Sequence, residues 1–126
     1  MDPSTSETYD LTHVQGLPVP MTWYLSPDGY RSEFVEGWVR IGPLHRFYQE
    51  VRHRETDNGV VVADSVLRIH GRFAREGRTL KVVYLFRTPF GKGYRGRTYE
   101  RGGDGTISGV ESLEGVDIGV FRYARR

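Results

Sequence analysis

The sequence predicts an all-β protein that folds as a small closed antiparallel up-and-down β-barrel of about eight or nine strands. Strand-like segments are separated along most of the chain by turn residues, as in Ser26-Pro27-Asp28-Gly29 and Asp57-Asn58-Gly59. The connections are short enough for neighbouring strands to pair as hairpins. Aromatic residues make up 13% of the chain and occur in most of these segments, so they can supply the core of a barrel.

The length of 126 residues is that of one domain. We expect residues 1–8 to be a disordered tail and residues 9–126 to be a single barrel domain. The first residues have neither the basic flank nor the apolar stretch of a signal peptide, and no apolar run is long enough to cross a bilayer. These observations predict a cytoplasmic protein with no membrane partner. The chain has no cysteine, which excludes disulfides and thiolate metal sites.

The clearest strand pair runs from Val60 to Arg87, with a turn at Glu76-Gly77. Apolar and charged residues alternate along it, which is the period of a strand with one buried face. The positions expected to face inward are Leu67, Ile69, Gly71, Phe73, Leu80, Val82, Tyr84 and Phe86. A slip of one residue would bury Arg68 and Arg72, so burial specifies the register of this pair.

Further strands are expected at residues 9–14, 22–26, 31–41, 44–55, 94–101, 106–110 and 116–124. Residues 44–55 also fit a helix, because Leu44, Phe47 and Val51 follow helical spacing. We favour a strand, because Phe47, Gln49 and Val51 also alternate and Asp57-Asn58-Gly59 is a strong hairpin signal. This alternation directs Phe47 and Gln49 inward and Tyr48 outward.

A glycine-rich basic segment occupies residues 90–97. It lacks the spacing of a phosphate-binding loop, and no helix follows it. We interpret it as a mobile loop at the rim of the barrel that gates its mouth. An RNA-binding alternative requires Arg95, Arg97 and Arg101 to share one exposed face. Because the net charge is only +2, we do not expect a nucleic-acid partner.

The four histidines are not expected to bind a metal. His45 and His53 lie too far apart along one strand to share an ion, and His70 falls on the charged outer face. His13 shares the face of Tyr9 and can enter the lumen. The sequence therefore predicts no metal site and no cofactor.

Covalent catalysis is also not expected. The chain has no Gly-x-Ser-x-Gly motif and no cysteine nucleophile. Glu33 and Glu36 have an odd spacing, so a strand sends them to opposite faces and at most one of them is luminal.

The sequence carries two resemblances to known barrels. The opening Thr8-Tyr9-Asp10-Leu11-Thr12-His13-Val14-Gln15-Gly16-Leu17-Pro18 and the unit His70-Gly71-Arg72-Phe73 resemble small bacterial lipocalin-like barrels of the calycin type. The stretch Gly37-Trp38-Val39-Arg40-Ile41, followed by Phe47-Tyr48-Gln49-Glu50, is similar to strands of the β-barrel cyclases of spirotetronate polyketide biosynthesis, the Diels-Alderases. The second resemblance implies that Tyr48 is a luminal tyrosine that contacts a substrate carbonyl, whereas the alternation places Tyr48 outside.

These observations lead to one leading hypothesis and one rival. The leading hypothesis is a cofactor-free cyclase that closes a ring, for example by a [4+2] reaction, in an apolar polyene or polyketide-like intermediate held inside the barrel, in natural-product biosynthesis. The expected catalytic residues are Tyr48 and Tyr84. The expected substrate-binding residues are His13, Trp23, Tyr24, Glu33, Phe47, Gln49, Phe73, Phe86 and Tyr94. The rival is a non-catalytic lipocalin-like carrier of a small apolar molecule. The sequence leaves open whether the chain forms a homodimer.

Overall fold

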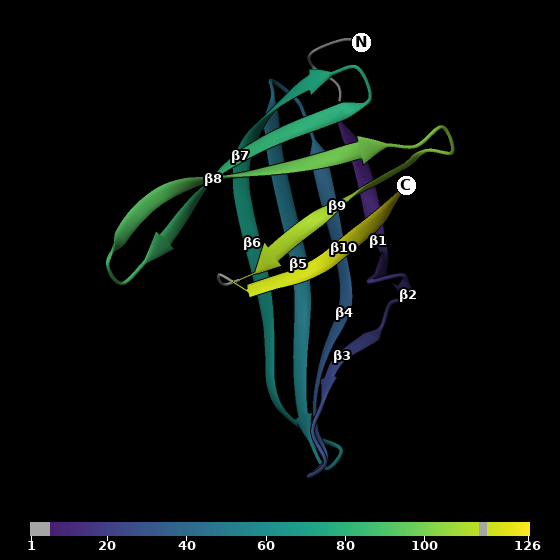
Figure 1. The fold of residues 1–126 in the computed structure, drawn as a ribbon, viewed down its shortest axis with the longest axis vertical. Coiled ribbons are helices and arrows are strands. Elements are labelled where there is room, and N and C mark those ends of the chain that lie inside the picture. Colours follow the sequence, from purple (N-terminus) through teal and green to yellow (C-terminus); the bar gives the residue numbers. More distant parts are fainter. Residues whose placement is uncertain (1–5, 114–115) are drawn as a thin grey trace.

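The computed structural model describes residues 6–113 and 116–126, with side chains described for all of these except residues 86–88, 113 and 116. Within this part of the chain every regular element is a strand (Figure 1). The strands are β1 (Glu7–Val14), β2 (Leu17–Pro18), β3 (Met21–Leu25), β4 (Tyr30–Ile41), β5 (Arg46–Asp57), β6 (Val60–Glu76), β7 (Thr79–Thr88), β8 (Gly91–Arg101), β9 (Thr106–Leu113) and β10 (Val116–Arg125). The described residues contain no helix that could cross a membrane.

Eight of these strands close into a barrel. Each strand from β4 to β10 pairs antiparallel with the next one along the chain, and β10 pairs with β1. The ring is closed by β1 against β4, with Tyr9 opposite Val39. Strands β2 and β3 are additional and extend the edges of β1 and β4. The predicted closed antiparallel up-and-down barrel is therefore confirmed.

The core consists of the inward positions of all eight barrel strands. Because side chains alternate along a strand, every second residue enters the interior. The large side chains that are almost fully buried there are Tyr9, Ile41, Phe34, Phe47, Leu80, Tyr99, Ile107, Phe121 and Tyr123. The interior of the barrel thus holds aromatic and aliphatic side chains, together with the buried polar residues Gln49, Arg97 and Glu111.

Residues 44–55 fit either a strand or a helix by sequence pattern. The structure places Arg46–Asp57 in β5, and Phe47, Gln49 and Val51 are buried as the alternation predicts. Tyr48 lies on the outer face of the barrel wall. The helix alternative is therefore wrong, because the hairpin turn at Asn58-Gly59, with φ of 51° and 84°, pairs the whole of β5 with residues 60–72 of β6.

The glycine-rich segment 90–97 is not a rim loop. It begins β8, which pairs with β7 from Thr88 opposite Gly91 to Thr79 opposite Glu100. Glycine lowers strand propensity but still provides both backbone hydrogen-bonding groups, and the partner strand β7 is rich in β-branched and aromatic residues. The expectation of a loop was wrong because it relied on composition and ignored the pairing strand.

A charged cluster closes the end of the barrel where β1 begins. Glu7 is only 4% exposed, and its Oε2 accepts hydrogen bonds from Tyr9 at 2.7 Å and from Arg101 at 2.9 Å. Its Oε1 lies 3.4 Å from Arg75 Nη2. Burial alone would raise the pKa of Glu7, but the Tyr9 hydrogen bond and the arginine charges outweigh it, so the pKa is lowered.

This cluster is expected to make the stability of the barrel sensitive to acid. A carboxyl group whose pKa is lower in the folded state stabilises the fold above its unfolded pKa, and that contribution is lost as the pH falls through the folded pKa. The stability advantage of the natural chain over Glu7→Gln should therefore shrink as the pH falls from about 5 to about 2. Urea unfolding at each pH measures this advantage. An advantage that is unchanged at acid pH would contradict the assignment of Glu7.

Candidate functional site

The barrel wall opens where β6 and β7 separate. These strands pair only from Gly71 opposite Tyr84 to Glu76 opposite Thr79. Beyond Tyr84, β7 pairs with β8 alone, and this hairpin projects away from the barrel (Figure 1). A Cβ on Gly71 would overlap the carbonyl oxygen of Val83 and would approach the Tyr84 Cβ to 3.0 Å. The close approach of β6 and β7 at the last pair before they separate thus depends on the absence of a side chain at Gly71.

Gly71→Ala is expected to destabilise the fold by about 1–3 kcal/mol, because the added methyl group must displace backbone rather than a flexible side chain. Thermal or urea unfolding measures the loss. Gly96→Ala is the matched control on β8, because its Cβ would meet nothing closer than the Val82 carbonyl oxygen at 3.9 Å. Equal losses in the two variants would show that the close approach at Gly71 does not limit stability.

A cleft of about 370 Å³ lies at this separation, and we call it the notch cleft. Its volume is within the range of small-molecule sites. Its lining is mainly aromatic and aliphatic, with cationic groups at one side. The lining residues are Arg46, Phe47, Tyr48, His70, Gly71, Arg72, Val83, Tyr84, Leu85 and Tyr94.

Two arginines face each other at the edge of the notch cleft. Arg46 on β5 is directly opposite Arg72 on β6, and both are exposed. Among the described residues, neither has an acidic partner within ion-pair distance. Like charges directly opposite each other on neighbouring strands are destabilising. An anion bound between the two guanidinium groups would relieve this repulsion.

Tyr48 forms part of the outer wall of the notch cleft. Its ring makes an edge contact with the His70 ring, with centroids 4.9 Å apart. The Arg40 guanidinium lies 4.6 Å from the ring centroid on the other side, in a cation–π arrangement. Arg40 Nε is buried without a hydrogen-bond partner. The ring of Tyr48 is therefore held in place by a cation and an imidazole.

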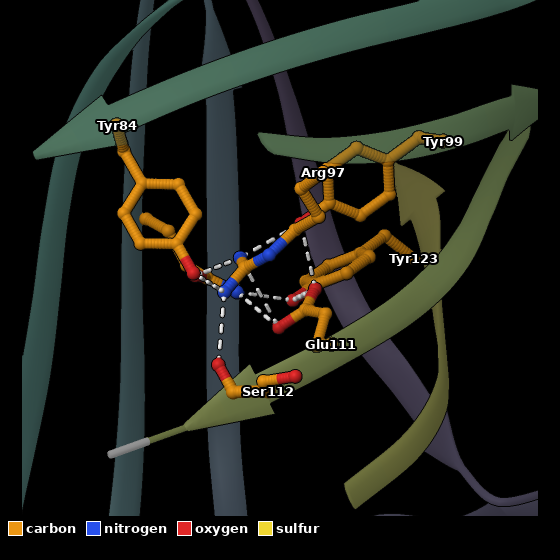
Figure 2. Close-up of polar contacts among 7 residues, drawn as sticks. Tyr84, Arg97, Tyr99, Glu111, Ser112 and Tyr123 are labelled. Carbon is orange, nitrogen blue, oxygen red and sulfur yellow. Dashed lines mark hydrogen bonds and ion pairs between the residues drawn. The ribbon is translucent and has the colours of Figure 1, made fainter. Parts of the chain in front are cut away.

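Behind the notch cleft, a network of charged and polar side chains crosses the barrel interior (Figure 2). Glu111 on β9 is 0% exposed. Its Oε1 accepts a hydrogen bond from Gln49 at 2.7 Å, and its Oε2 accepts from the hydroxyls of Tyr99 at 2.8 Å and Tyr123 at 2.6 Å. Arg97 Nη1 lies 3.5 Å from Glu111 Oε1 and forms a buried ion pair.

The guanidinium of Arg97 connects this network to the notch cleft. Its Nη1 donates to Gln49 Oε1 at 2.7 Å and to the Tyr99 hydroxyl at 3.1 Å. Its Nη2 donates over longer distances, to the Tyr84 hydroxyl at 3.4 Å and to the Ser112 carbonyl oxygen at 3.3 Å. Nη2 is thus less strongly engaged than Nη1, and it is the nitrogen that faces Tyr84 (Figure 2).

The protonation states in the network follow from burial and from Glu111. Burial raises the pKa values of Tyr99 and Tyr123 well above the usual value, and the negative charge of Glu111 raises them further. Both hydroxyls therefore remain hydrogen-bond donors. Burial alone would lower the pKa of Arg97, but the charge of Glu111 and the contacts with Tyr99 and Tyr84 together outweigh this, and the pKa is raised.

Tyr84 belongs to both the notch cleft and the network. It lines the cleft, and its hydroxyl accepts a hydrogen bond from Arg97. Among the described residues, no acceptor is present for the hydroxyl proton of Tyr84. A hydroxyl that accepts from a cation and retains a proton to donate is suited to hydrogen-bond a ligand oxygen.

The structure brings some of the predicted site residues together. Phe47, Tyr48, Tyr84 and Tyr94 share the notch cleft, and Gln49 lies in the network behind it. Both expected catalytic tyrosines are therefore at one site, although Tyr48 is on the outer face of the wall. Phe86 lies outside the residues whose side chains are described.

The other predicted residues lie elsewhere. Trp23 and Tyr24 pack against each other on β3, and Trp23 Nε1 donates to Ser32 Oγ at 2.9 Å. The remaining three residues each contact a neighbour outside the notch cleft. Glu33 Oε1 lies 2.7 Å from Arg54 Nη2, and His13 Nδ1 lies 2.9 Å from Thr12 Oγ1. The ring centroid of Phe73 lies 5.8 Å from that of His45.

Two central residues, Arg97 and Glu111, were missed as site residues. Only the RNA-binding alternative assigned a place to Arg97, on an exposed face with Arg95 and Arg101, but its side chain is 2% exposed. The signal was present, because Arg97 shares its strand face with Tyr99, a residue suited to the core. Glu111 follows Ile107 at an even spacing, which places a carboxylate on the buried face. The exposed arginine row that RNA binding requires is absent from the described part of β8.

Fold and site together define a closed eight-stranded antiparallel β-barrel with a buried ion pair behind an aromatic cleft. This architecture is compatible with a lipocalin-like barrel. No protein family, curated protein or solved structure matches the chain.

Proposed function

We propose that the protein binds a small, mainly apolar molecule in the notch cleft and closes a ring in it without a cofactor. The observation that carries this proposal is the position of Tyr84, which lines the cleft while Arg97 donates to its hydroxyl from behind. A ligand carbonyl that accepts from Tyr84 would be polarised by a hydroxyl that is itself polarised by a cation. The lipocalin-like and cyclase resemblances of the sequence agree with this proposal.

The lining of the notch cleft indicates the kind of ligand. Val83, Leu85 and Tyr94 provide apolar and aromatic contact for a polyene or ring system. Arg46 and Arg72 at its edge favour a ligand that ends in a carboxylate or another anionic group. The proposed substrate class is therefore a linear polyene or polyketide-like acid with an internal carbonyl.

Ring closure of such a substrate needs little machinery. In a [4+2] closure the three π bonds of a diene and an alkene are replaced by two new carbon–carbon σ bonds and one new π bond, no atom leaves, and no proton is transferred. A general base is therefore not required. Holding the chain in a reactive conformer contributes to the rate, and a hydrogen bond from Tyr84 to a carbonyl conjugated with the alkene makes that alkene more electrophilic.

The second candidate is a carrier that binds the same class of molecule without converting it. It is favoured by the packing of the barrel centre, where Tyr9, Tyr99 and Tyr123 are almost fully buried. A filled interior leaves the ligand at the wall of the barrel rather than enclosed in it. Binding alone then accounts for the aromatic lining and for the cationic edge.

Ligand binding can be tested with two fluorescent probes of similar shape, the anionic anilinonaphthalene sulfonate and the neutral N-phenylnaphthylamine. Both are expected to bind, and the Arg46→Gln/Arg72→Gln variant should weaken binding of the anionic probe by about tenfold, since hydrogen bonds to charged groups contribute about 1.5–3 kcal/mol. Affinity for the neutral probe should be nearly unchanged. Fluorescence titration measures both affinities.

The control variant is Arg31→Gln/Arg78→Gln, which removes the same net charge from exposed positions away from the notch cleft. It should leave both affinities nearly unchanged. If neither probe binds the natural chain, the proposal of an apolar site is wrong. If the control variant loses as much affinity as the Arg46/Arg72 variant, the long-range field of the protein, and not this arginine pair, attracts the anion.

A further inference from the structure

Among the described strands, part of one edge of β6 has no neighbour. On one side β6 pairs with β5 from Val60 to Arg72, but on the other side it pairs with β7 only from Gly71 onward. Residues 60–70 therefore present a free edge, visible in Figure 1 as the lower part of β6. The edge carries exposed valines, with 65% of Val60, 56% of Val62 and 40% of Val66 accessible. A long free edge with apolar side chains is a template for pairing with another strand.

The backbone groups on this edge can be assigned. The Phe73 N–H donates to the His45 carbonyl oxygen next to β5. In an antiparallel pair, alternate residues direct their N–H and C=O groups to the same side, so the odd-numbered residues from Ala63 to Phe73 serve β5, up to the register shift next to Val61. The even-numbered residues Asp64, Val66 and Arg68 then direct theirs to the free edge. They are the residues that can bond to another chain.

The charges on this edge are complementary to the charges on the same edge of a second, antiparallel copy. If this edge pairs with the same edge of a second copy around a two-fold axis, one residue lies on the axis and forms a hydrogen-bonded pair with itself. That residue can be Asp64, Val66 or Arg68. The first register places two carboxylates together, and the third places two guanidinium groups together. Only the register centred on Val66 sets Asp64 opposite Arg68 of the second copy, and the symmetry makes this contact twice.

The existing ion pairs would extend across such an interface. Within one chain Arg52 Nη2 lies 2.7 Å from Asp64 Oδ2, and Arg68 Nε lies 3.0 Å from Glu50 Oε1. With Asp64 beside Arg68 of the second copy, the two pairs join into one alternating row of charges. The side chains of Asp64 and Arg68 remain 37% and 62% exposed in the single chain, so both can reach a partner.

We propose that the free edge of β6 pairs antiparallel with the same edge of a second copy, with Val66 on the two-fold axis, to form a homodimer with a continuous sheet across the interface. This inference does not depend on the ligand. Backbone hydrogen bonds of the even-numbered residues hold the two strands together, and burial of the valines adds to the stability. The charges of Asp64 and Arg68 select the register.

Sedimentation velocity of the full chain over a wide range of protein concentration tests the proposal. The natural chain should show the mass of two chains. Val66→Lys should weaken the dimer by at least about tenfold, because it places two like charges together on the axis. The single variants Asp64→Arg and Arg68→Asp should do the same. The double variant Asp64→Arg/Arg68→Asp restores opposite charges across the axis and should recover much of the dimer.

Glu36→Lys is the matched control, because Glu36 also contacts Arg52, at 3.7 Å, but lies on β4 away from the free edge. It should leave the dimer intact. Thermal unfolding of each variant verifies that the chain is folded, and Val66→Lys leaves all the ion pairs of the single chain in place. A monomeric natural chain would overturn the proposal. A dimer that resists both Val66→Lys and the single charge reversals would also overturn it, because it would use another surface.

Discussion

Glu111→Gln is expected to lower the free energy of unfolding by about 3–5 kcal/mol, because it leaves the buried charge of Arg97 without a counter-ion. Glutamine has nearly the shape of glutamate, so packing changes little. The hydroxyls of Tyr99 and Tyr123 also lose a charged acceptor that lies 2.6–2.8 Å away. Urea unfolding at neutral pH measures the loss.

Two further variants separate charge from packing. Glu100→Gln on the same sheet changes a carboxylate that is exposed and contacts Thr79 Oγ1 at 3.1 Å, so it should cost no more than about 0.5 kcal/mol. Arg97→Met/Glu111→Leu removes both members of the ion pair and should cost less than the sum of the two single replacements. A loss below about 1 kcal/mol for Glu111→Gln would show that Arg97 does not depend on this carboxylate.

Tyr84→Phe is expected to reduce turnover of a linear trienone, in which a diene and an enone can close a ring, by about a hundredfold. The hydroxyl donates to the carbonyl more strongly as the enone becomes electron-rich in the transition state, so its loss acts on the rate. Binding of N-phenylnaphthylamine should change little, because this neutral probe has no carbonyl. Product formation is followed by chromatography.

Tyr24→Phe is the control for Tyr84→Phe, because Tyr24 is an exposed tyrosine on β3 and does not line the notch cleft. It should leave turnover unchanged. If the natural chain binds the trienone without converting it, the carrier is the correct function. If Tyr84→Phe converts the trienone as fast as the natural chain does, Tyr84 has no part in the reaction.

The barrel could be predicted from the sequence because both of its determinants are local. Alternation of apolar and polar residues specifies which face of each strand is buried, as for Phe47, Gln49 and Val51. Turn residues such as Asn58-Gly59 specify which strands are neighbours. Neither signal depends on contacts between residues far apart in the chain.

The site was harder to predict because it depends on contacts between residues that are far apart in the chain. Arg97 and Glu111 are 14 residues apart on different strands, and each alone is a charged residue that composition assigns to the surface. Only their pairing inside the barrel makes burial of both acceptable. The separation of β6 from β7, which forms the notch cleft, likewise has no local signal except Gly71. Tyr48 and Tyr84 were chosen as tyrosines for a lumen, and the structure joins them instead at the wall.

The proposed ligand site, where β6 and β7 separate, can be located by titration of the isotope-labelled protein with N-phenylnaphthylamine, followed by amide chemical shifts in nuclear magnetic resonance spectra. We expect the largest shifts at Tyr48, His70, Val83, Leu85 and Tyr94. Shifts concentrated at Trp23 and Tyr24 on β3, or no shifts at all, would contradict this proposal.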